Sequence, residues 1–337
     1  MRKGVDLWTT FHEDWAQERS RLGLANLYQN LETVLGERHI KCEKSYMTDE
    51  EFKTLQFPLP KEIDIHNLYF SYHTKTNLER FNLFHIHSTS FPGYFLIDRL
   101  GYAGFSSYAS YNTAFLESQN EDDKVVNEWF DKFSGDIIDN NITRIIQDDE
   151  ELKVDKPYFF IAGQTKMDAV VSKLSNVDGQ EYYNRICELA LKLGYGVVYK
   201  PHPLVRKNTL LKRGEGDFHT PNYPNVTEYN GSIHKAISNA EAVYVINSNV
   251  GMEALLHGKQ VYTAGNCDYK WVTHQIDTLD SIDIEHENIS TDVIKKFLYY
   301  MVNHVYVDSY DIHNIEKRVD NILLEYFLNI NSKNTTL

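Results

Sequence analysis

The strongest constraint on the fold is a regular alternation of short apolar segments with helical segments in the second half of the chain. Short β-branched and aromatic runs predict strands, and apolar residues at helical spacing predict helices. The expected strands lie at 158–162, 195–199, 242–246 and 260–264. The expected helices lie at 180–193, 232–240, 250–257, 290–304 and 311–329. Strands that alternate with helices pair in parallel through right-handed crossovers, so this half is predicted to be α/β with a doubly wound sheet.

The first half of the chain is less regular. Helical spacing predicts helices at 21–36 and 48–57, and short aromatic and aliphatic runs predict strands at 66–72 and 81–87. A loop rich in Gly and Tyr is expected at 91–105. A charged stretch with helical spacing follows at 121–147, with a break expected near Ser134 and Gly135. Because the two halves differ and 337 residues suffice for two cores, we expect two domains.

The expected domains comprise residues 1–150 and 157–310, joined by a linker at 149–156 and followed by a C-terminal helix and polar tail at 311–337. No apolar run approaches the ~20 residues that span a bilayer. Residues 1–6 are followed by no apolar core, so they do not resemble a secretory signal. Three scattered cysteines fit a reducing compartment, and a cytoplasmic location is therefore expected.

The charge balance argues against a polyanionic partner. The net charge is −14, which should repel nucleic acid and anionic lipid. Basic residues nevertheless gather in one short stretch, at Lys200, Arg206, Lys207, Lys212 and Arg213. This stretch is either a pocket for a compact anion or a solvated loop, and its composition alone favours neither reading.

In a doubly wound sheet, ligands bind at the carboxyl ends of the strands. The loop after the strand at 195–199 begins Lys200-Pro201-His202-Pro203. The prolines fix the backbone around His202, which could donate a hydrogen bond to a phosphate oxygen while Lys200 adds positive charge. A plain turn is the alternative, and a short His-Pro motif by itself favours the turn.

Two further strand ends carry polar residues. After the strand at 242–246, Ser248 or Asn249 is expected to cap a helix whose free N–H groups could bind phosphate, and Glu253 could accept hydrogen bonds from ribose hydroxyls. After the strand at 158–162, Asp168 is either the cap of the next helix or a carboxylate that faces the crevice. One shared site explains polar residues at three successive strand ends better than three coincidences.

These motifs resemble those of the retaining β-Kdo glycosyltransferases of bacterial capsule and lipopolysaccharide assembly. The resemblance lies in Gln164-x-x-x-Asp168, in Lys200-Pro-His202-Pro, and in Ser248 followed by Gly251-x-Glu253-Ala-Leu-x-x-Gly258-Lys259, and it covers about residues 157–275. The His-Pro element is shared with bacterial sialyltransferases, which also use CMP-sugars.

The resemblance implies an α/β fold of the GT-B type, with two Rossmann-like domains, an active site in the cleft between them and no metal or other cofactor. It implies that His202 and Ser248 hold the phosphate of CMP-Kdo and that Asp168 attacks the anomeric carbon. The other donor-binding positions carried over are Gln164, Lys200, Asn249 and Glu253. The domain at 157–310 would then bind the nucleotide sugar and the domain at 1–150 the acceptor, a glycan or glycolipid. Either peripheral association with the inner membrane or an assembly complex could bring the protein to a membrane-bound acceptor.

Candidates in the acceptor domain are weaker. Asp98 is a candidate acid, base or acceptor-orienting carboxylate, and Arg99 and His73 are candidate acceptor contacts. An Asp98–Arg99 surface turn is at least as consistent with the sequence. Two alternatives to CMP-Kdo transfer stay open: transfer from another CMP-sugar such as sialic acid, and a catalytically silent protein that binds glycan or acts as a scaffold.

Overall fold

A computed structural model describes residues 23–40, 42, 59, 63–145, 147–203, 218–283 and 286–334. The helix expected at 48–57 and the basic residues Arg206, Lys207, Lys212 and Arg213 lie outside these residues. The chain forms two compact units. Unit 1 comprises residues 1–107 and 305–337, and unit 2 comprises residues 108–304. Each unit is described by itself below.

The boundaries of the two units differ from the boundaries expected for the two domains. Helices α5 (Thr113–Ser118) and α6 (Asp123–Asp139) pack against α12 (Thr291–Tyr300) of unit 2. The last helix, α13 (Ile312–Asn334), packs against α2 (Leu24–Glu37) of unit 1. Packing between segments far apart in sequence therefore sets the boundaries, and the segment expected as a linker, 149–156, lies inside unit 2 without regular secondary structure.

Unit 1 is built on a four-stranded sheet with the strand order β1-β2-β3-β10. Its strands are β1 (Tyr69–Tyr72), β2 (Leu83–Ser88), β3 (Tyr94–Asp98) and β10 (Val307–Asp308). Strands β1 and β2 are parallel, whereas β3 is antiparallel to both β2 and β10. The sheet is thus mixed and not the parallel sheet that a Rossmann-like domain would have.

The connection between β2 and β3 explains this difference. Only residues 89–93 separate the two strands, and a parallel crossover needs about a dozen residues. Strand β3 lies within the segment expected to be a loop, so that prediction was wrong. The run Tyr94-Phe95-Leu96-Ile97-Asp98 is apolar enough to form a buried strand despite the glycines on either side.

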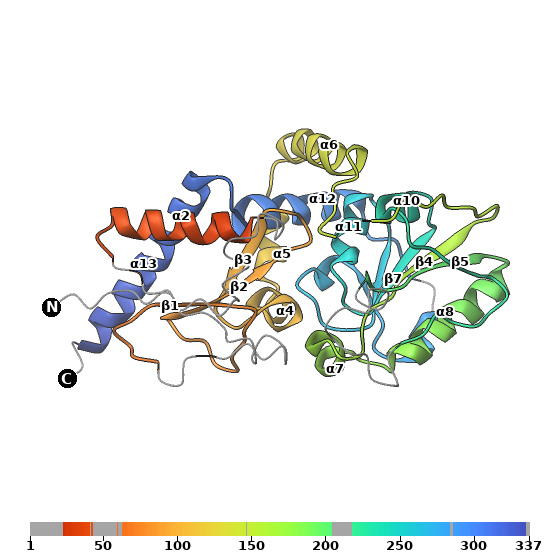
Figure 1. The fold of residues 1–337 in the computed structure, drawn as a ribbon, viewed down its shortest axis with the longest axis horizontal. Helices are drawn as coiled ribbons and strands as arrows, with labels where there is room; N and C mark the ends of the chain where they lie inside the picture. The colour runs from red at the N-terminus through yellow and green to blue at the C-terminus, as the bar shows by residue number, and fades with distance from the viewer. Residues whose placement is uncertain are drawn as a thin grey trace. The chain divides into compact units, whose positions relative to one another are not determined.

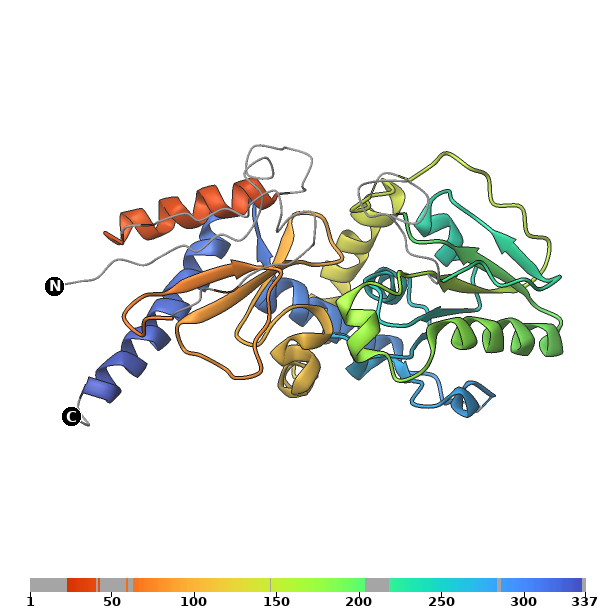
Figure 2. The same ribbon diagram turned by 60° about the horizontal axis from the view of Figure 1, so that its bottom comes forward.

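Helices α2 and α13 pack on one face of this sheet, as Figures 1 and 2 show. Their apolar residues form a common core with the strands, including Leu31, Phe70, Ile86, Phe95 and Ile322.

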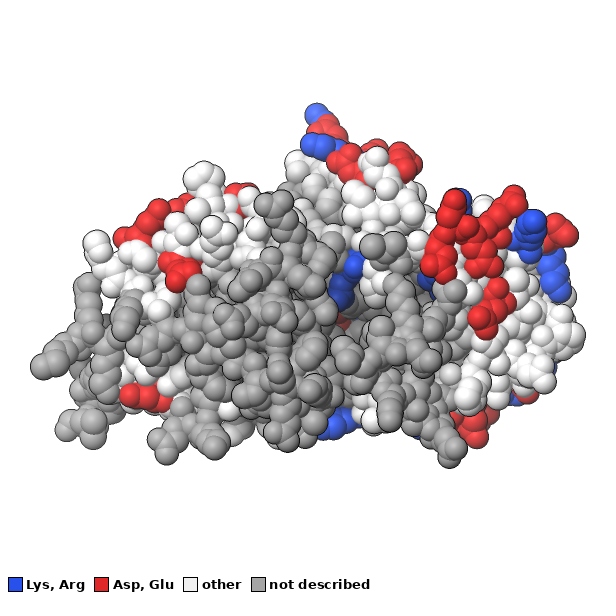
Figure 3. Space-filling model, viewed as in Figure 1, with Lys and Arg blue, Asp and Glu red and all other residues white. Residues whose placement is uncertain are grey.

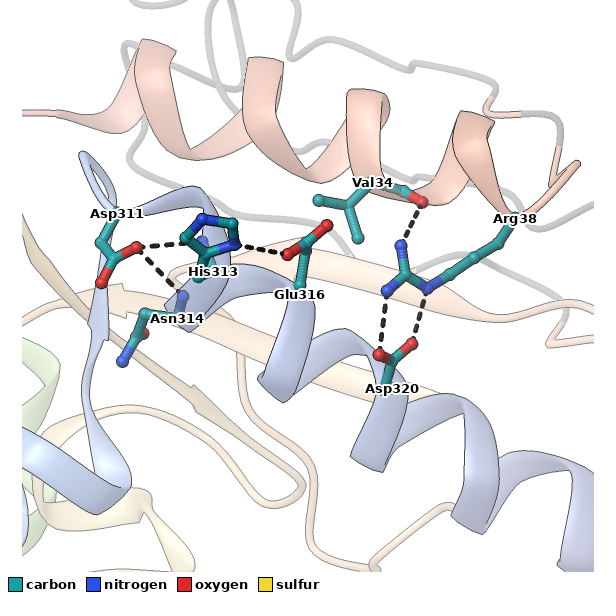
Figure 4. A network of polar contacts seen from close by, with 7 residues as sticks. All are labelled: Val34, Arg38, Asp311, His313, Asn314, Glu316 and Asp320. Atoms are coloured by element: carbon teal, nitrogen blue, oxygen red, sulfur yellow. Dashed lines mark hydrogen bonds and ion pairs between the residues drawn. The ribbon is translucent and has the colours of Figure 1, made fainter.

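A polar contact joins the same two helices at their surface. Figure 4 shows Arg38 at the end of α2 donating from Nε and Nη2 to the two carboxylate oxygens of Asp320, at 2.6 and 2.9 Å. Arg38 also donates to the carbonyl of Val34. At the start of α13, Asp311 accepts hydrogen bonds from the backbone N–H groups of His313 and Asn314 and so caps the helix.

Unit 2 is built on a six-stranded sheet in which every pairing is parallel. The strand order is β6-β5-β4-β7-β8-β9. The strands are β4 (Tyr158–Ala162), β5 (Gly196–Lys200), β6 (Val226–Glu228), β7 (Ala242–Val245), β8 (Val261–Thr263) and β9 (His274–Gln275). In chain order this is the 3-2-1-4-5-6 arrangement of a Rossmann domain, which confirms the predicted α/β sheet.

The helices of unit 2 cover both faces of the sheet (Figures 1 and 2). The helices between its strands are α7 (Ala169–Leu174), α8 (Gly179–Leu193), α10 (Ile233–Ser238) and α11 (Val250–Leu256), while α4 (Ser107–Ser110) begins at the boundary between the units. The predicted break in α6 was wrong, because the helix runs unbroken through Ser134 and Gly135. An exposed helix interior tolerates glycine at about 1 kcal/mol relative to alanine.

The described surface is predominantly acidic, in agreement with the net charge of −14. Figure 3 shows acidic side chains on α6 and over much of the visible part of unit 2, with basic side chains between them. Within the described part of the chain, no helix is both long and apolar enough to cross a membrane.

Candidate active site

The two central strands of the unit 2 sheet, β4 and β7, mark the point at which the strand order reverses. Chain segments leave them toward opposite faces, and this switch point is where doubly wound sheets bind ligands. Gln164 follows β4 and Asn247 follows β7, and their side chains meet. The Gln164 Nε2 donates to Asn247 Oδ1 at 2.9 Å, and its Oε1 accepts the Asn247 backbone N–H at 3.0 Å.

The two side chains that form this link are buried. Asn247 Nδ2 donates to the carbonyl of Val170 at 2.9 Å, and both amide side chains are about 95% buried. Gln164 uses one N–H and its carbonyl oxygen to bond Asn247, and it therefore fixes the spacing of the two loops that carry Asp168 and Ser248. Its binding of the donor stays a prediction.

Asp168 caps α7, as the sequence predicts. Its Oδ1 accepts the Val170 backbone N–H at 3.0 Å, and the residue is exposed. Among the described residues, no other donor reaches this carboxylate, whereas the capping carboxylates of Asp122 and Asp178 each accept two backbone N–H groups. The protein that surrounds Asp168 still raises the pKa of its carboxyl group, and the hydrogen bond from Val170 opposes the rise. Asp168 thus combines a fixed backbone with an accessible oxygen.

Ser248 and Asn249 begin α11. Ser248 Oγ accepts the N–H of Val250, the first residue of the helix, at 3.3 Å, whereas the residue in the N-cap position is Asn249. The Asn249 side chain makes no capping bond, although its carbonyl accepts the N–H of Met252. The hydroxyl of Tyr269 donates to the Ser248 carbonyl, and its ring lies so close to Gly251 that a Cβ there would be 2.4 Å from the hydroxyl. Glycine is thus required at 251 by this contact.

Glu253 is the most unusual titratable group of the site. It lies one turn into α11 and is only 9% exposed. No described residue donates a hydrogen bond to its carboxylate. Burial raises its pKa to about 7, while the nearby cations Arg144 and Lys200 act in the opposite direction. A buried carboxylate without donors is unfavourable in the folded protein, which indicates a group that is completed by a ligand.

Lys200 is the last residue of β5, and its side-chain ammonium group binds backbone carbonyls. Its Nζ donates to the carbonyls of Asn230 and Gly231 at 2.9 and 2.6 Å. His202 lies two residues further on and is partly exposed. The predicted donor-binding lysine thus serves first to hold the loop after β6, and its charge still reaches Glu253.

The sequence analysis missed Arg144. Ile142, two residues earlier, accepts a hydrogen bond from His234 Nε2 at 2.9 Å, and His234 Nδ1 lies 3.0 Å from His257 Nε2. Residues 141–145 are thereby tied to α10 and to the end of α11. In the sequence, only its positive charge marks Arg144 as a candidate. The hydrogen bond that places its segment joins Ile142 to His234, 92 positions further along the chain.

In unit 1, Asp98 is a structural residue of the loop that follows β3. It is 2% exposed, and its oxygens accept the backbone N–H groups of Leu100, Gly101 and Ser107 as well as the Ser107 hydroxyl. A carboxylate that accepts four donors has no lone pair directed at a substrate. This geometry does not suit the predicted acid, base or acceptor-orienting role.

Arg99 and His73 occupy different settings. Arg99 forms an ion pair with Glu325 of α13, which is an intramolecular contact and not an acceptor contact. His73 has a positive φ of 55° and stacks on Tyr102 with ring centres 4.1 Å apart, beside His87. His73 is therefore partly exposed and lies between a buried ring, Tyr102, and a partly exposed one, His87.

The structure thus brings all seven residues of the predicted donor-binding set to the carboxyl ends of the strands or to the helix that follows. Gln164, Asp168, Lys200, His202 and Ser248 all lie at the carboxyl ends of β4, β5 and β7, with Asn249 and Glu253 in the helix that follows. This arrangement could hold a nucleotide by hydrogen bonds to its sugar and present a carboxylate to it.

Comparison with solved structures shows a shared fold. The chain is similar to the β-Kdo 2,4 transferase of Thermosulfurimonas dismutans KpsC, with a TM-score of 0.52, 12% identity and coverage of 87% of this chain and 90% of that chain. It is also similar to the β-Kdo 2,7 transferase of the same KpsC, with a TM-score of 0.50, 16% identity and coverage of 92% and 98%. The fold is accordingly α/β of the GT-B type.

Two sequence comparisons add to the structural ones. A stretch of 73 residues is 44% identical to protein FixF of Sinorhizobium fredii, which covers 21% of this chain and 16% of that protein. The model of the capsule polysaccharide biosynthesis protein family matches residues 104–311. This match includes every strand of the unit 2 sheet and extends over more than half of the chain, so the protein belongs to the capsule polysaccharide biosynthesis family.

Proposed function

We propose that this protein is a retaining glycosyltransferase that moves Kdo from CMP-Kdo to a growing glycan or glycolipid of a capsule or lipopolysaccharide. The proposed acceptor lies at the cytoplasmic face of the membrane, and the proposal assigns no metal or other cofactor to the reaction. The family match, the fold shared with KpsC and the carboxylates at the switch point support it.

The observation that carries the proposal is Glu253. Its carboxylate is buried at the edge where a doubly wound sheet binds nucleotides, and no described residue donates a hydrogen bond to it. A ribose diol offers two O–H donors at the spacing of the two carboxylate oxygens. Ionised Glu253 is stabilised by such donors, because hydrogen bonds to the charged form lower a raised pKa. We therefore assign the ribose of CMP to Glu253.

Asp168 is the proposed nucleophile. One carboxylate oxygen attacks the anomeric carbon of Kdo, and the bond from this carbon to the phosphate oxygen breaks, so that CMP leaves with the electron pair. An acceptor hydroxyl then attacks the same carbon and gives its proton to water, while the bond to Asp168 breaks and the carboxylate leaves with the electron pair. Two displacements retain the configuration. The exposed carboxylate of Asp168 and its fixed position at the start of α7 suit this role.

The test compares two capping aspartates. Asn caps a helix about as well as Asp, so Asp168→Asn should leave stability nearly unchanged while removing the nucleophile. Asp178→Asn is the matched control, because Asp178 is also an N-cap aspartate, at the start of α8. With CMP-Kdo generated in the assay and CMP release as the readout, Asp168→Asn should lose at least a thousandfold in rate and Asp178→Asn should keep the wild-type rate.

Three results would overturn parts of the proposal. Near-wild-type turnover of Asp168→Asn would return Asp168 to a purely structural cap. Turnover with CMP-sialic acid but not with CMP-Kdo would replace the donor. Failure of the wild-type protein to bind CMP would remove the enzyme assignment and favour a glycan-binding protein.

A further inference from the structure

We propose that Tyr269, in the loop that follows β8, is a positioning residue for the ribose of the nucleotide: it holds the start of α11 in place and thereby sets the position of Glu253. This inference rests on the proposed function, because it takes the ribose diol of CMP as the ligand of Glu253. The role also accounts for the glycine at position 251, two residues before this carboxylate.

Helix α11 begins without a strong cap of its own. At the starts of α7, α8 and α10, the side chain of the N-cap residue accepts a backbone N–H group. The N-cap residue of α11, Asn249, makes no such bond, and the bond from the Val250 N–H to Ser248 Oγ is long at 3.3 Å. Because a helix of seven residues is too short to be stable by itself, contacts from elsewhere in the fold must fix where α11 begins.

Tyr269 supplies these contacts on two sides of the helix start. Its hydroxyl donates to the Ser248 carbonyl, which also accepts the Gly251 N–H at 2.9 Å. Its ring lies against Gly251, where a Cβ would be 2.4 Å from the hydroxyl and 2.5 Å from ring carbon Cε2. Tyr269 is fully buried, so the ring and the first turn of α11 are held against each other. Glu253 lies about half a turn beyond Gly251, and any shift of this turn would move its carboxylate.

The loop that carries Tyr269 is itself fastened to the end of α7. The Asn176 N–H donates to the Ala264 carbonyl at 2.7 Å, and the Asn266 N–H donates to the Leu174 carbonyl at 3.0 Å. The loop therefore connects α7, which begins at the proposed nucleophile, with α11, which carries the proposed ribose acceptor. Tyr269 is the side chain through which this connection reaches α11.

The test measures what the ribose diol contributes to binding, as the ratio of the affinities for CMP and for 2′,3′-dideoxy-CMP, which lacks the two hydroxyls. Calorimetry at pH 8 keeps Glu253 ionised, because its pKa is about 7. Tyr269→Phe removes the hydroxyl and keeps the ring. It should lower the ratio by about threefold to tenfold, the range of one net hydrogen bond, and change the affinity for the dideoxy compound by less than about twofold.

Tyr158→Phe is the matched control. Tyr158 begins β4, at the other end of the sheet from the proposed site, and its buried hydroxyl also donates to a backbone carbonyl, that of Ala236, at 2.9 Å. Both variants thus lose one tyrosine hydroxyl bonded to a carbonyl, and thermal unfolding checks that both are folded at the assay temperature. Tyr158→Phe should keep the wild-type ratio of affinities.

Two further variants test whether Tyr269 acts through Glu253. In a Glu253→Gln background the ionised acceptor is gone, so adding Tyr269→Phe should lower the ratio no further. Gly251→Ala disturbs the same contact from the side of the helix and should lower the ratio as Tyr269→Phe does. A further drop in the Glu253→Gln background, or a wild-type ratio in Gly251→Ala, would contradict the positioning role.

The remaining outcomes separate the two proposals. If the wild-type protein favours CMP over the dideoxy compound and Tyr269→Phe lowers the ratio no more than Tyr158→Phe does, the role of Tyr269 is refuted and the proposed function stands. If Tyr269→Phe weakens both compounds equally, Tyr269 only maintains the fold, and the inference is also overturned. A wild-type protein that binds neither compound refutes the proposed function, and a wild-type ratio near one refutes the ribose assignment; the inference falls in both cases.

Discussion

Replacing Glu253 by glutamine should stabilise the unliganded protein, and the gain should depend on pH. Glutamine keeps the shape of the side chain and removes the charge. The pKa of Glu253 rises from 4.5 in the unfolded chain to about 7 in the folded protein. At about 1.36 kcal/mol per pH unit, this difference destabilises the wild-type protein by about 3 kcal/mol above pH 7.

The sign follows from proton binding. Between pH 4.5 and about 7 the folded state holds the Glu253 proton more tightly than the unfolded state does, so stability falls as the pH rises through this window. Below pH 4.5 the residue is protonated in both states, and the difference disappears. Glu253→Gln should therefore exceed the wild type by about 3 kcal/mol at pH 8 and by less than about 1 kcal/mol at pH 5.

Urea unfolding at both pH values measures this difference directly. Glu287→Gln is the control, because Glu287 is exposed and its substitution should change stability by less than about 0.5 kcal/mol at either pH. A gain for Glu253→Gln that is equal at pH 5 and pH 8 would refute the reasoning, as would a wild type that is the more stable protein at pH 8. The same variant should lose stabilisation by CMP, since the acceptor of the ribose hydroxyls is gone.

Three further predictions concern the same unit. Gln164→Ala leaves buried polar atoms of Asn247 without partners and should lower the free energy of unfolding by about 2–4 kcal/mol, measured in urea. Gln180→Ala, which removes exposed hydrogen bonds to His219, should lower it by less than about 1 kcal/mol. Equal losses would contradict a stabilising role for the hydrogen bonds between Gln164 and Asn247. Gly251→Ala places a methyl group 2.4 Å from the buried hydroxyl of Tyr269 and should lower the free energy of unfolding by about 1–3 kcal/mol. Gly36 has open space around it, so Gly36→Ala should leave the protein equally stable or make it more stable. A Gly36→Ala protein that is less stable than the Gly251→Ala protein would refute the close contact. Cytidine affinity should fall by up to about tenfold per pH unit below pH 7, as Glu253 becomes protonated; affinity that is constant from pH 5 to pH 8 in an NMR titration would exclude an ionised acceptor.

The sheet of unit 2 was predictable from the sequence because its determinants are local. Its central strands are buried on both faces and read as short continuous apolar runs, and the helices between them begin at residues such as Asp168 and Asp178. The loops at the strand ends then follow from topology alone, which is how the sequence located Glu253 and Ser248.

Unit 1 depends instead on contacts between distant parts of the chain. Strand β3 pairs with β10, so that Phe95 lies opposite Val307 across more than two hundred residues. No local pattern identifies β10, which has only two residues. The setting of Asp98 also depends on the folded chain. Its sequence position, in a turn next to an arginine, gives no sign that four donors surround its carboxylate.

The candidate site shows the same division. Residues on strand ends were found, whereas Arg144 was missed because it lies in an irregular segment whose position depends on His234 and Glu150. A polar residue after a strand indicates a site, but only the structure shows that the Gln164 amide is hydrogen-bonded to Asn247; donor binding by Gln164 stays a prediction.

The most direct test of the central claim is intact-protein mass spectrometry after incubation with CMP-Kdo generated in the assay, for the wild type and for Asp168→Asn. The account predicts a mass gain of one Kdo residue on the wild-type protein that is absent from the variant. An equal mass gain on both proteins, or none on a wild-type protein that binds CMP and turns over the donor, would contradict the proposed glycosyl-enzyme intermediate.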